Sequence, residues 1–91
     1  MEIKVKRIHK LDDVDLKLKG FADIVIDDEL IISGFRIVQG KDRMYVGVPQ
    51  ELLKNGRWHD RVHVIKPETM KHINYIVLSA FDNLEQIGGK K

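Results

Sequence analysis

A group of basic, imidazole and aromatic side chains surrounds one short segment in the second half of the chain. Its members are Lys54, Arg57, Trp58, His59, Arg61 and, a few residues later, Lys66. The pair Asn55-Gly56 inside it is typical of a tight type I′ turn, because both central positions of that turn need a positive φ. Lysine and arginine neutralise phosphates, and an aromatic ring can stack on a base. The segment therefore predicts a hairpin or extended loop that contacts nucleic acid, and we call these six residues the basic cluster.

Other roles are open to the same segment. Trp58 could instead plug the edge of a sheet, as a lone tryptophan often does. His59, Asp60 and His63 could offer ligands to a metal ion, but in a strand the two imidazoles would lie about 13 Å apart, too far for one ion. Hydrogen bonds from Asp60 and His63 that brace the loop are a simpler role, and no metal site is assigned.

Several motifs of catalysis are absent from the chain. It has no cysteine, no glycine-rich phosphate loop and no Gly-x-Ser-x-Gly elbow. These features are common signatures of thiol nucleophiles, of phosphate-binding loops and of serine hydrolases. We therefore expect a protein that is not an enzyme and that needs no cofactor.

Length and composition describe one globular domain spanning residues 1–91. The chain is 43% hydrophobic and 33% charged, with a formal net charge of +2. A core of this size is small, so association with a partner subunit would help to stabilise it. Without cysteine, stability must come from packing or association rather than from disulfides. No apolar stretch resembles a signal peptide or a membrane span, so we expect a cytoplasmic protein with no membrane partner.

The elements that position the basic cluster are predicted from hydrophobic periodicity. Alternating runs indicate strands at 2–8, 21–26, 30–39 and 44–48. Leu16 and Leu18 either extend the hairpin of the first strand or begin the second strand. Ile8 breaks the alternation of the first run, and Gly20 is expected to interrupt the chain before the second. Asp27-Asp28-Glu29 forms a turn, and Pro49 ends the fourth strand. Residues 1–66 are thus predicted to form the sheet and the irregular basic loop.

A helix is predicted over residues 67–87. Pro67 suits its first turn, and Glu68 complements its N-terminal dipole. Its apolar stripe consists of Met70, Ile73, Val77, Ala80 and Leu84, widened by Ile76 and Phe81. Residues 88–91 are expected to form a short tail. The fold class is therefore α+β: a four- to five-stranded antiparallel sheet with an irregular basic loop and one C-terminal helix packed on the sheet.

The third strand is apolar on both faces, as the runs 30–32 and 35–38 show. A sheet covered on one side alternates cleanly, so this pattern indicates that the second face is also covered. A chain this short has only one helix to offer. We therefore predict a homodimer in which another copy covers the second face. The alternative is that loops or the basic first strand fold over it.

The order of these elements and their sequences resembles a known family. The residues that carry the resemblance are 24–29 (IVIDDE), 35–40 (FRIVQG), 45–49 (YVGVP), 56–60 (GRWHD), His63 and Ile65. This ordered set, which spans nearly the whole chain, is similar to the stage V sporulation protein G (SpoVG) family of bacterial regulators. The resemblance implies a small dimeric β-sheet protein with a C-terminal helix, connected with septation and sporulation, that binds DNA and RNA at selected sites.

The chain departs from that family after Pro49. Many members continue with Ser-Lys-Arg, a basic pair implicated in nucleic-acid contact, whereas this chain continues with Gln50-Glu51-Leu52. An acid there would repel phosphate, so binding would depend on the basic cluster. Our first hypothesis is a nucleic-acid-binding homodimer, with Trp58 or Tyr45 stacking on exposed bases. The second is an adaptor that contacts division or sporulation proteins without binding nucleic acid.

Overall fold

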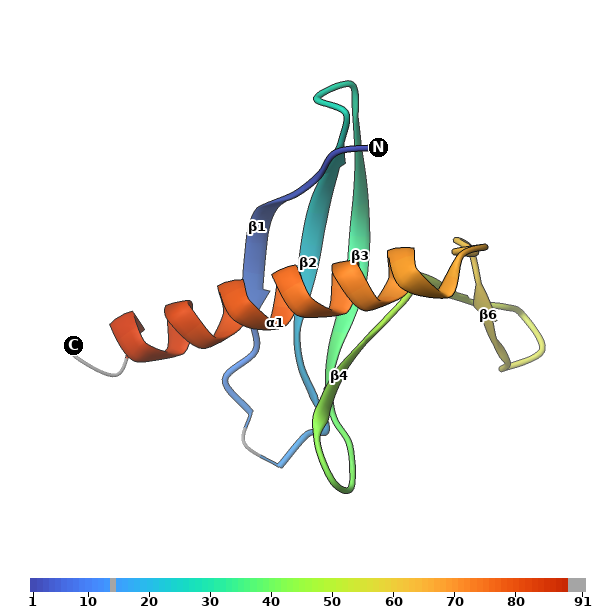
Figure 1. Cartoon of the computed structure of the whole chain (residues 1–91). Coiled ribbons are helices and arrows are strands. Elements are labelled where there is room, and N and C mark those ends of the chain that lie inside the picture. Colours follow the sequence, from blue (N-terminus) through green and yellow to red (C-terminus); the bar gives the residue numbers. More distant parts are fainter. Residues whose placement is uncertain (14, 89–91) are drawn as a thin grey trace.

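The structure, a computed structural model that describes residues 1–13 and 15–88, is an antiparallel sheet crossed by one long helix (Figure 1). The sheet contains, in spatial order, β1 (Ile3–Lys10), β2 (Leu18–Ile26), β3 (Leu30–Gln39) and β4 (Met44–Gly47). A separate two-stranded sheet, β5 (Gln50–Leu52) with β6 (Trp58–Asp60), precedes the helix α1 (Pro67–Gly88). The predicted α+β fold class is confirmed. The part of the predicted tail from residue 89 onward lies outside the described residues.

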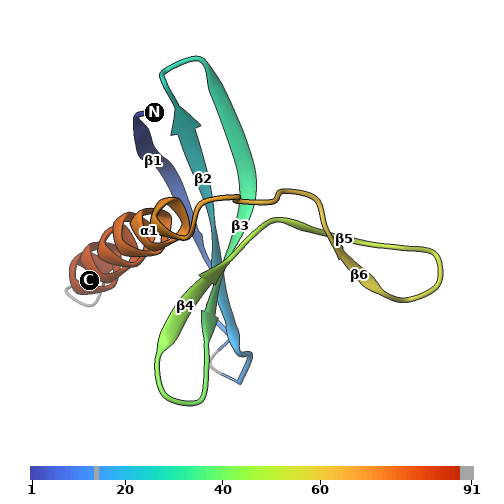
Figure 2. The ribbon, with the colours of Figure 1, turned by 45° about the vertical axis from the view of Figure 1, so that its right-hand side comes forward.

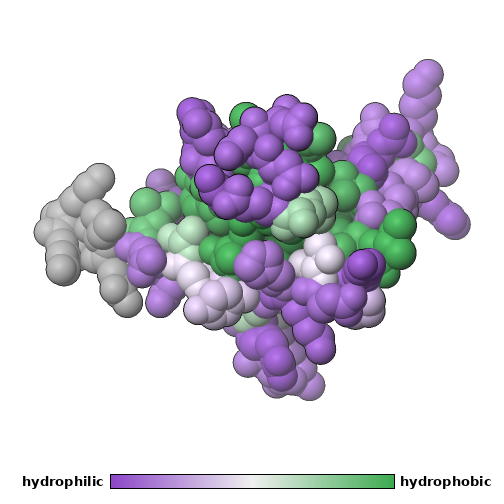
Figure 3. Space-filling view, turned by 45° about the horizontal axis from the view of Figure 1, so that its top comes forward, coloured by the Kyte–Doolittle hydropathy of each residue, from purple (hydrophilic) through white to green (hydrophobic). Residues whose placement is uncertain are grey.

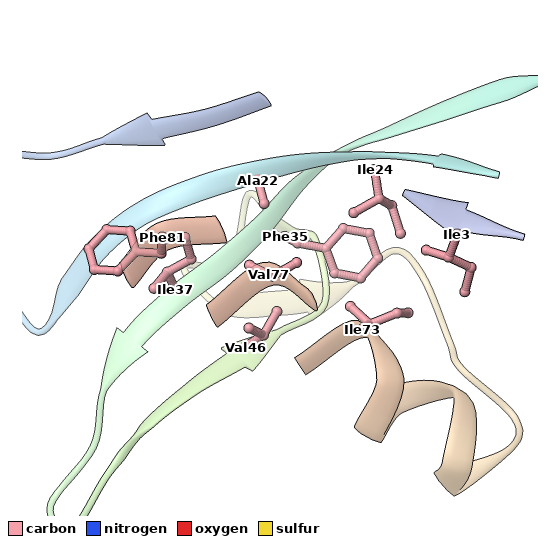
Figure 4. Close-up of a cluster of buried hydrophobic side chains, with 9 residues drawn as sticks. All are labelled: Ile3, Ala22, Ile24, Phe35, Ile37, Val46, Ile73, Val77 and Phe81. Atoms are coloured by element: carbon pink, nitrogen blue, oxygen red, sulfur yellow. The ribbon is translucent and has the colours of Figure 1, made fainter. Parts of the chain in front are cut away.

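Helix α1 packs its apolar stripe on one face of the sheet. Ile73, Val77 and Phe81 are buried there, as the periodicity predicted. The sheet contributes Ile3, Ala22, Ile24, Phe35, Ile37 and Val46 to the same core (Figure 4). Burial of one large apolar side chain contributes about 1.5–3 kcal/mol, so this layer is the main source of stability. A hydrogen bond also ties the helix to the edge strand, because the Val46 N–H donates to Asn74 Oδ1 over 2.9 Å.

A β-bulge in β1 explains why Ile8 breaks the alternation of the first strand. Val5 pairs with Ile24 and Arg7 with Asp23, so Lys6 is an extra residue with no partner of its own on β2. An inserted residue reverses the side-chain alternation beyond it. Ile8 therefore returns to the covered face, where it is half-buried against the core.

Gly20 does not interrupt the chain, and that prediction is wrong. β2 begins at Leu18 and continues through Gly20, which pairs with Lys10 of β1. A Cβ atom at residue 20 would lie 2.6 Å from the carbonyl oxygen of His9. The glycine is needed because the two backbones approach closely, a tertiary constraint that looks like a chain break in the sequence.

The face of the sheet opposite α1 is the open face. It carries Phe21, Val25 and Val38, which are half-buried, and Ile31 and Tyr45, which are 53% and 43% exposed. β1 forms an edge of the sheet, whereas the β5–β6 hairpin and Lys17 border a cavity with Phe21 and Val38 on part of this face. A second copy of the chain is still the predicted cover for the exposed Ile31 and Tyr45. None of the described helices is long and apolar enough to cross a membrane.

Candidate nucleic-acid interface

The β5–β6 hairpin extends away from the sheet on the side opposite α1 (Figure 2). Two interactions hold its base: the Arg61 N–H donates to the Pro49 carbonyl over 2.9 Å, and Gln50 Nε2 donates to Asp60 Oδ1 over 2.8 Å. Asp60 therefore braces the hairpin within its own two strands, by a bond to its cross-strand partner. His63 is exposed and makes no such bond among the described residues. The hairpin thus has a fixed base and an exposed tip.

The tip is a tight turn, but not of the predicted type I′. The Gly56 N–H donates to the Leu53 carbonyl over 3.0 Å, which places Lys54 and Asn55 at the centre of the turn. Gly56 has a φ of +83°, whereas Asn55 is not among the residues of positive φ. Asn55 Oδ1 instead accepts a hydrogen bond from the Arg57 N–H over 2.9 Å. This is the arrangement of a longer hairpin loop, in which one left-handed glycine follows an ordinary turn.

One face of the hairpin carries Glu51, His59 and Arg61. Glu51 and His59 are paired across the strands, and Arg61 Nη1 lies 3.5 Å from Glu51 Oε1. Lys54 and Arg57 are exposed at the tip. Figure 3 shows a largely hydrophilic surface over this end of the molecule, at the right of the view. Within the described residues, Glu51 thus neutralises Arg61 near the base of the hairpin and forms no ion pair with Lys54 or Arg57 at the tip.

Trp58 lies on the other face of the hairpin. It pairs with Leu52, and the two side chains are 64% and 55% exposed. Trp58 therefore does not plug the sheet within this chain, which contradicts that alternative. Its ring borders a cavity at the base of the hairpin together with Phe21 and Val38 of the open face. The tryptophan is thus separated from His59 and Arg61, with which the sequence had grouped it.

Lys66 is not part of the hairpin. Its carbonyl accepts hydrogen bonds from the N–H groups of Thr69 and Met70 over 3.1 and 3.3 Å and so begins α1. Its side chain borders an apolar cavity of about 700 Å³ on the helix side of the sheet, next to Leu30 and Ile65. The structure therefore places five members of the basic cluster on the hairpin, with Trp58 on the opposite face from His59 and Arg61, and leaves Lys66 apart.

Arg36 is a cation near the hairpin that was not predicted from the sequence. Its Nε donates to the Val48 carbonyl over 3.0 Å, and its side chain is half-buried on the open face. The sequence does contain a signal for it, because Arg36 is the single charged residue in the apolar run 35–38. A cation within an apolar strand is rarely buried unless it has a partner or a function.

Comparison with known proteins identifies the family. The model of the SpoVG family matches residues 1–83. The chain belongs to the SpoVG family. A SpoVG protein of Fusobacterium nucleatum is 32% identical over 87 residues, which cover 94% of each chain. One of Treponema denticola is 28% identical over 91 residues, covering 100% of this chain and 97% of its own. One of Brevibacillus brevis is 29% identical over 86 residues, covering 94% and 90%.

The predicted resemblance to SpoVG is therefore confirmed. The names of these SpoVG relatives associate them with septation and mention no reaction.

Proposed function

We propose that this SpoVG protein is a bacterial regulator of the septation and sporulation type that binds DNA or RNA as a homodimer. The observation that carries the proposal is the projecting hairpin, with Lys54 and Arg57 exposed at its tip. Its two carboxylates lie at the base, where Glu51 contacts Arg61 and Asp60 accepts from Gln50. Phosphate would therefore meet the cations first, and these supply the sequence-independent part of the affinity.

The open face supports the homodimer. It leaves Ile31 substantially exposed beside the half-buried Val25, and Tyr45 of β4 substantially exposed beside Val38. A second copy placed there would cover apolar surface that this chain leaves in solvent, and each copy would present one hairpin. Two hairpins in one particle double the number of phosphate contacts. We expect about six phosphates to be neutralised per dimer, so log affinity should fall with log salt at a slope near −5.

The test is a fluorescence-anisotropy titration of labelled DNA and RNA of mixed sequence, at about 50 mM and about 200 mM salt. Arg57→Ala with Arg61→Ala should weaken binding and flatten the salt slope. Lys41→Ala with Arg43→Ala is the matched control, because it removes two exposed cations from the β3–β4 turn, away from the hairpin. Equal losses in both double variants would show that net charge alone, and not the hairpin, drives binding.

A second candidate function is an adaptor that contacts division or sporulation proteins through the open face. Its supporting observation is the exposed apolar surface that includes Ile31. The substitution of Glu51 into the position of the usual basic pair also favours it, since a carboxylate repels phosphate. Absence of nucleic-acid binding even at about 50 mM salt would overturn the first proposal and leave this one.

A further inference from the structure

A cavity of about 400 Å³ lies where the base of the hairpin meets the open face. Its walls come from three parts of the chain that are distant in sequence. The residues that matter to its chemistry are Lys17, Phe21, Arg36, Gln50 and Trp58. Cavities of this volume hold one small ligand rather than a macromolecular surface.

The charge of the cavity has one sign. Lys17 and Arg36 border it, and none of its described lining residues is a carboxylate. No acidic side chain forms an ion pair with Arg36 within residues 1–13 and 15–84. A half-buried guanidinium without a counter-charge is costly, so a bound anion would stabilise this site.

Arg36 is held in place rather than free to leave the cavity. Its Nε donates to the Val48 carbonyl over 3.0 Å. Its guanidinium also lies directly over Gly47, where any Cβ atom would collide with it. Because the side chain is fixed before a ligand arrives, little conformational entropy is lost when its remaining N–H groups bind one.

The same cavity offers an aromatic wall. Trp58 is 64% exposed, and Phe21 is half-buried on the opposite, sheet side. An exposed tryptophan beside a cation is the combination that single-strand binding proteins use, with the ring stacking on a base and the cation contacting the phosphate. A ligand that contacts both the aromatic side chains and the cations of this cavity needs a planar ring joined to an anion. A nucleotide has both groups.

We infer that this cavity binds one unpaired nucleotide, with its base against Trp58 and its phosphate on Arg36. The inference rests on the proposed nucleic-acid binding and makes it specific to single strands. Bases in a duplex stay stacked and cannot enter a cavity for one ring without being flipped out. The hairpin cations would hold the backbone, and the cavity would take one base from it.

The cavity and a dimer seated on Val25 and Ile31 would use different parts of the open face. Val25 pairs with Ile31 toward the other end of β2 and β3, and neither residue borders the cavity. A second copy seated on this pair therefore leaves the base of the hairpin open, whereas Tyr45 pairs with Val38 at the cavity itself.

Trp58 is the only tryptophan in the chain, so its fluorescence reports on the cavity directly. The unmodified protein is titrated with a single-stranded oligonucleotide, the same sequence as a duplex, a nucleoside monophosphate and ribose 5-phosphate. We expect Trp58 quenching by the single strand and, at higher concentration, by the monophosphate, which separates a free nucleotide from one within a strand. Ribose 5-phosphate, which has no base, should leave the fluorescence unchanged.

Variants locate the site. Arg36→Gln should weaken single-strand affinity about tenfold, because it removes a charged hydrogen bond. Lys41→Ala, which removes one exposed cation outside the cavity, should change it little. Lys17 is exposed, so Lys17→Gln should fold normally, and an expected loss of about threefold can be measured even if Arg36→Gln folds poorly.

Four results would overturn the inference. Salt-sensitive anisotropy without any change in Trp58 fluorescence would reject the cavity and leave the proposed hairpin function standing. Equal quenching by duplex and single strand would reject the unpaired nucleotide. Fluorescence that changes with protein concentration, and not with nucleotide, would mean that a second copy buries Trp58. Failure of both anisotropy and fluorescence would reject the proposed function as well.

Discussion

Glu51 Oε1 lies 3.5 Å from Arg61 Nη1 across the base of the hairpin. Both side chains are more than half exposed, so the pair contributes little to stability, and its effect is on the charge that the hairpin presents. Arg61, one of the cations predicted to bind phosphate, is thereby paired with Glu51, which stands where many family members have a basic pair. In the proposed function, the departure after Pro49 would weaken nucleic-acid binding in two ways, by adding a negative charge and by engaging Arg61.

We expect Glu51→Gln to strengthen nucleic-acid binding. The amide keeps the size of the side chain but releases Arg61 for phosphate, so the salt slope should steepen by about one unit per protomer. The free energy of unfolding should change by less than about 0.5 kcal/mol, because the pair is exposed. Anisotropy titrations over a salt series measure the slope. Asp42→Asn removes one exposed carboxylate from the β3–β4 turn and is the control; a gain equal to that of Glu51→Gln would refute a local effect.

The hydrogen bond between the helix and the edge strand gives a stability prediction. Asn74→Ala removes the acceptor that lies 2.9 Å from the Val46 backbone nitrogen, so the free energy of unfolding should fall by about 1–3 kcal/mol. Asn83→Ala makes the same chemical change at an exposed position of α1 and should be close to neutral. Urea denaturation of both variants measures the difference. Equal midpoints would mean that the bond is not maintained in solution.

The close approach of β1 and β2 gives another stability prediction. Gly20→Ala places a Cβ atom 2.6 Å from the His9 carbonyl oxygen, a backbone atom that cannot rotate away. We expect a loss of about 1–3 kcal/mol in unfolding free energy. Gly56→Ala is the comparison, since its added Cβ meets no atom within 4 Å and only its φ of +83° is unfavourable, at about 1 kcal/mol. A Gly20→Ala variant as stable as Gly56→Ala would contradict the crowding between these two strands.

Features of the fold that depend on local sequence were predictable, and those that depend on distant chain were not. β3 has the bounds that alternation indicated, Leu30–Gln39, and α1 begins at Pro67. The bulge at Lys6 left only an unexplained break at Ile8, because the register of β1 is decided by its pairing with β2. Gly20 looked like a break for the same reason, since nothing local indicates how near β1 passes.

The same distinction between local and distant sequence applies to the candidate site. The hairpin residues from Lys54 to Arg61 are close in sequence, so their grouping followed directly. Which face each occupies depends on the strand pairing of β6, and that pairing separates Trp58 from His59. Arg36 reaches the base of the hairpin only through the fold, and Lys66 is drawn away from it by the start of α1.

The open face gives a prediction for the proposed dimer. Ile31 pairs with Val25 on that face and is 53% exposed, so Ile31→Lys should hardly affect folding but should oppose burial by a second copy. We expect sedimentation to shift from dimer to monomer and the salt slope of nucleic-acid binding to fall by about half, to near −2.5. Leu30→Lys is the matched control, because the neighbouring side chain is 50% exposed and borders the cavity on the helix side. If both variants stay dimeric, the open face is not the dimer surface; if both become monomeric, the second copy covers the helix side as well.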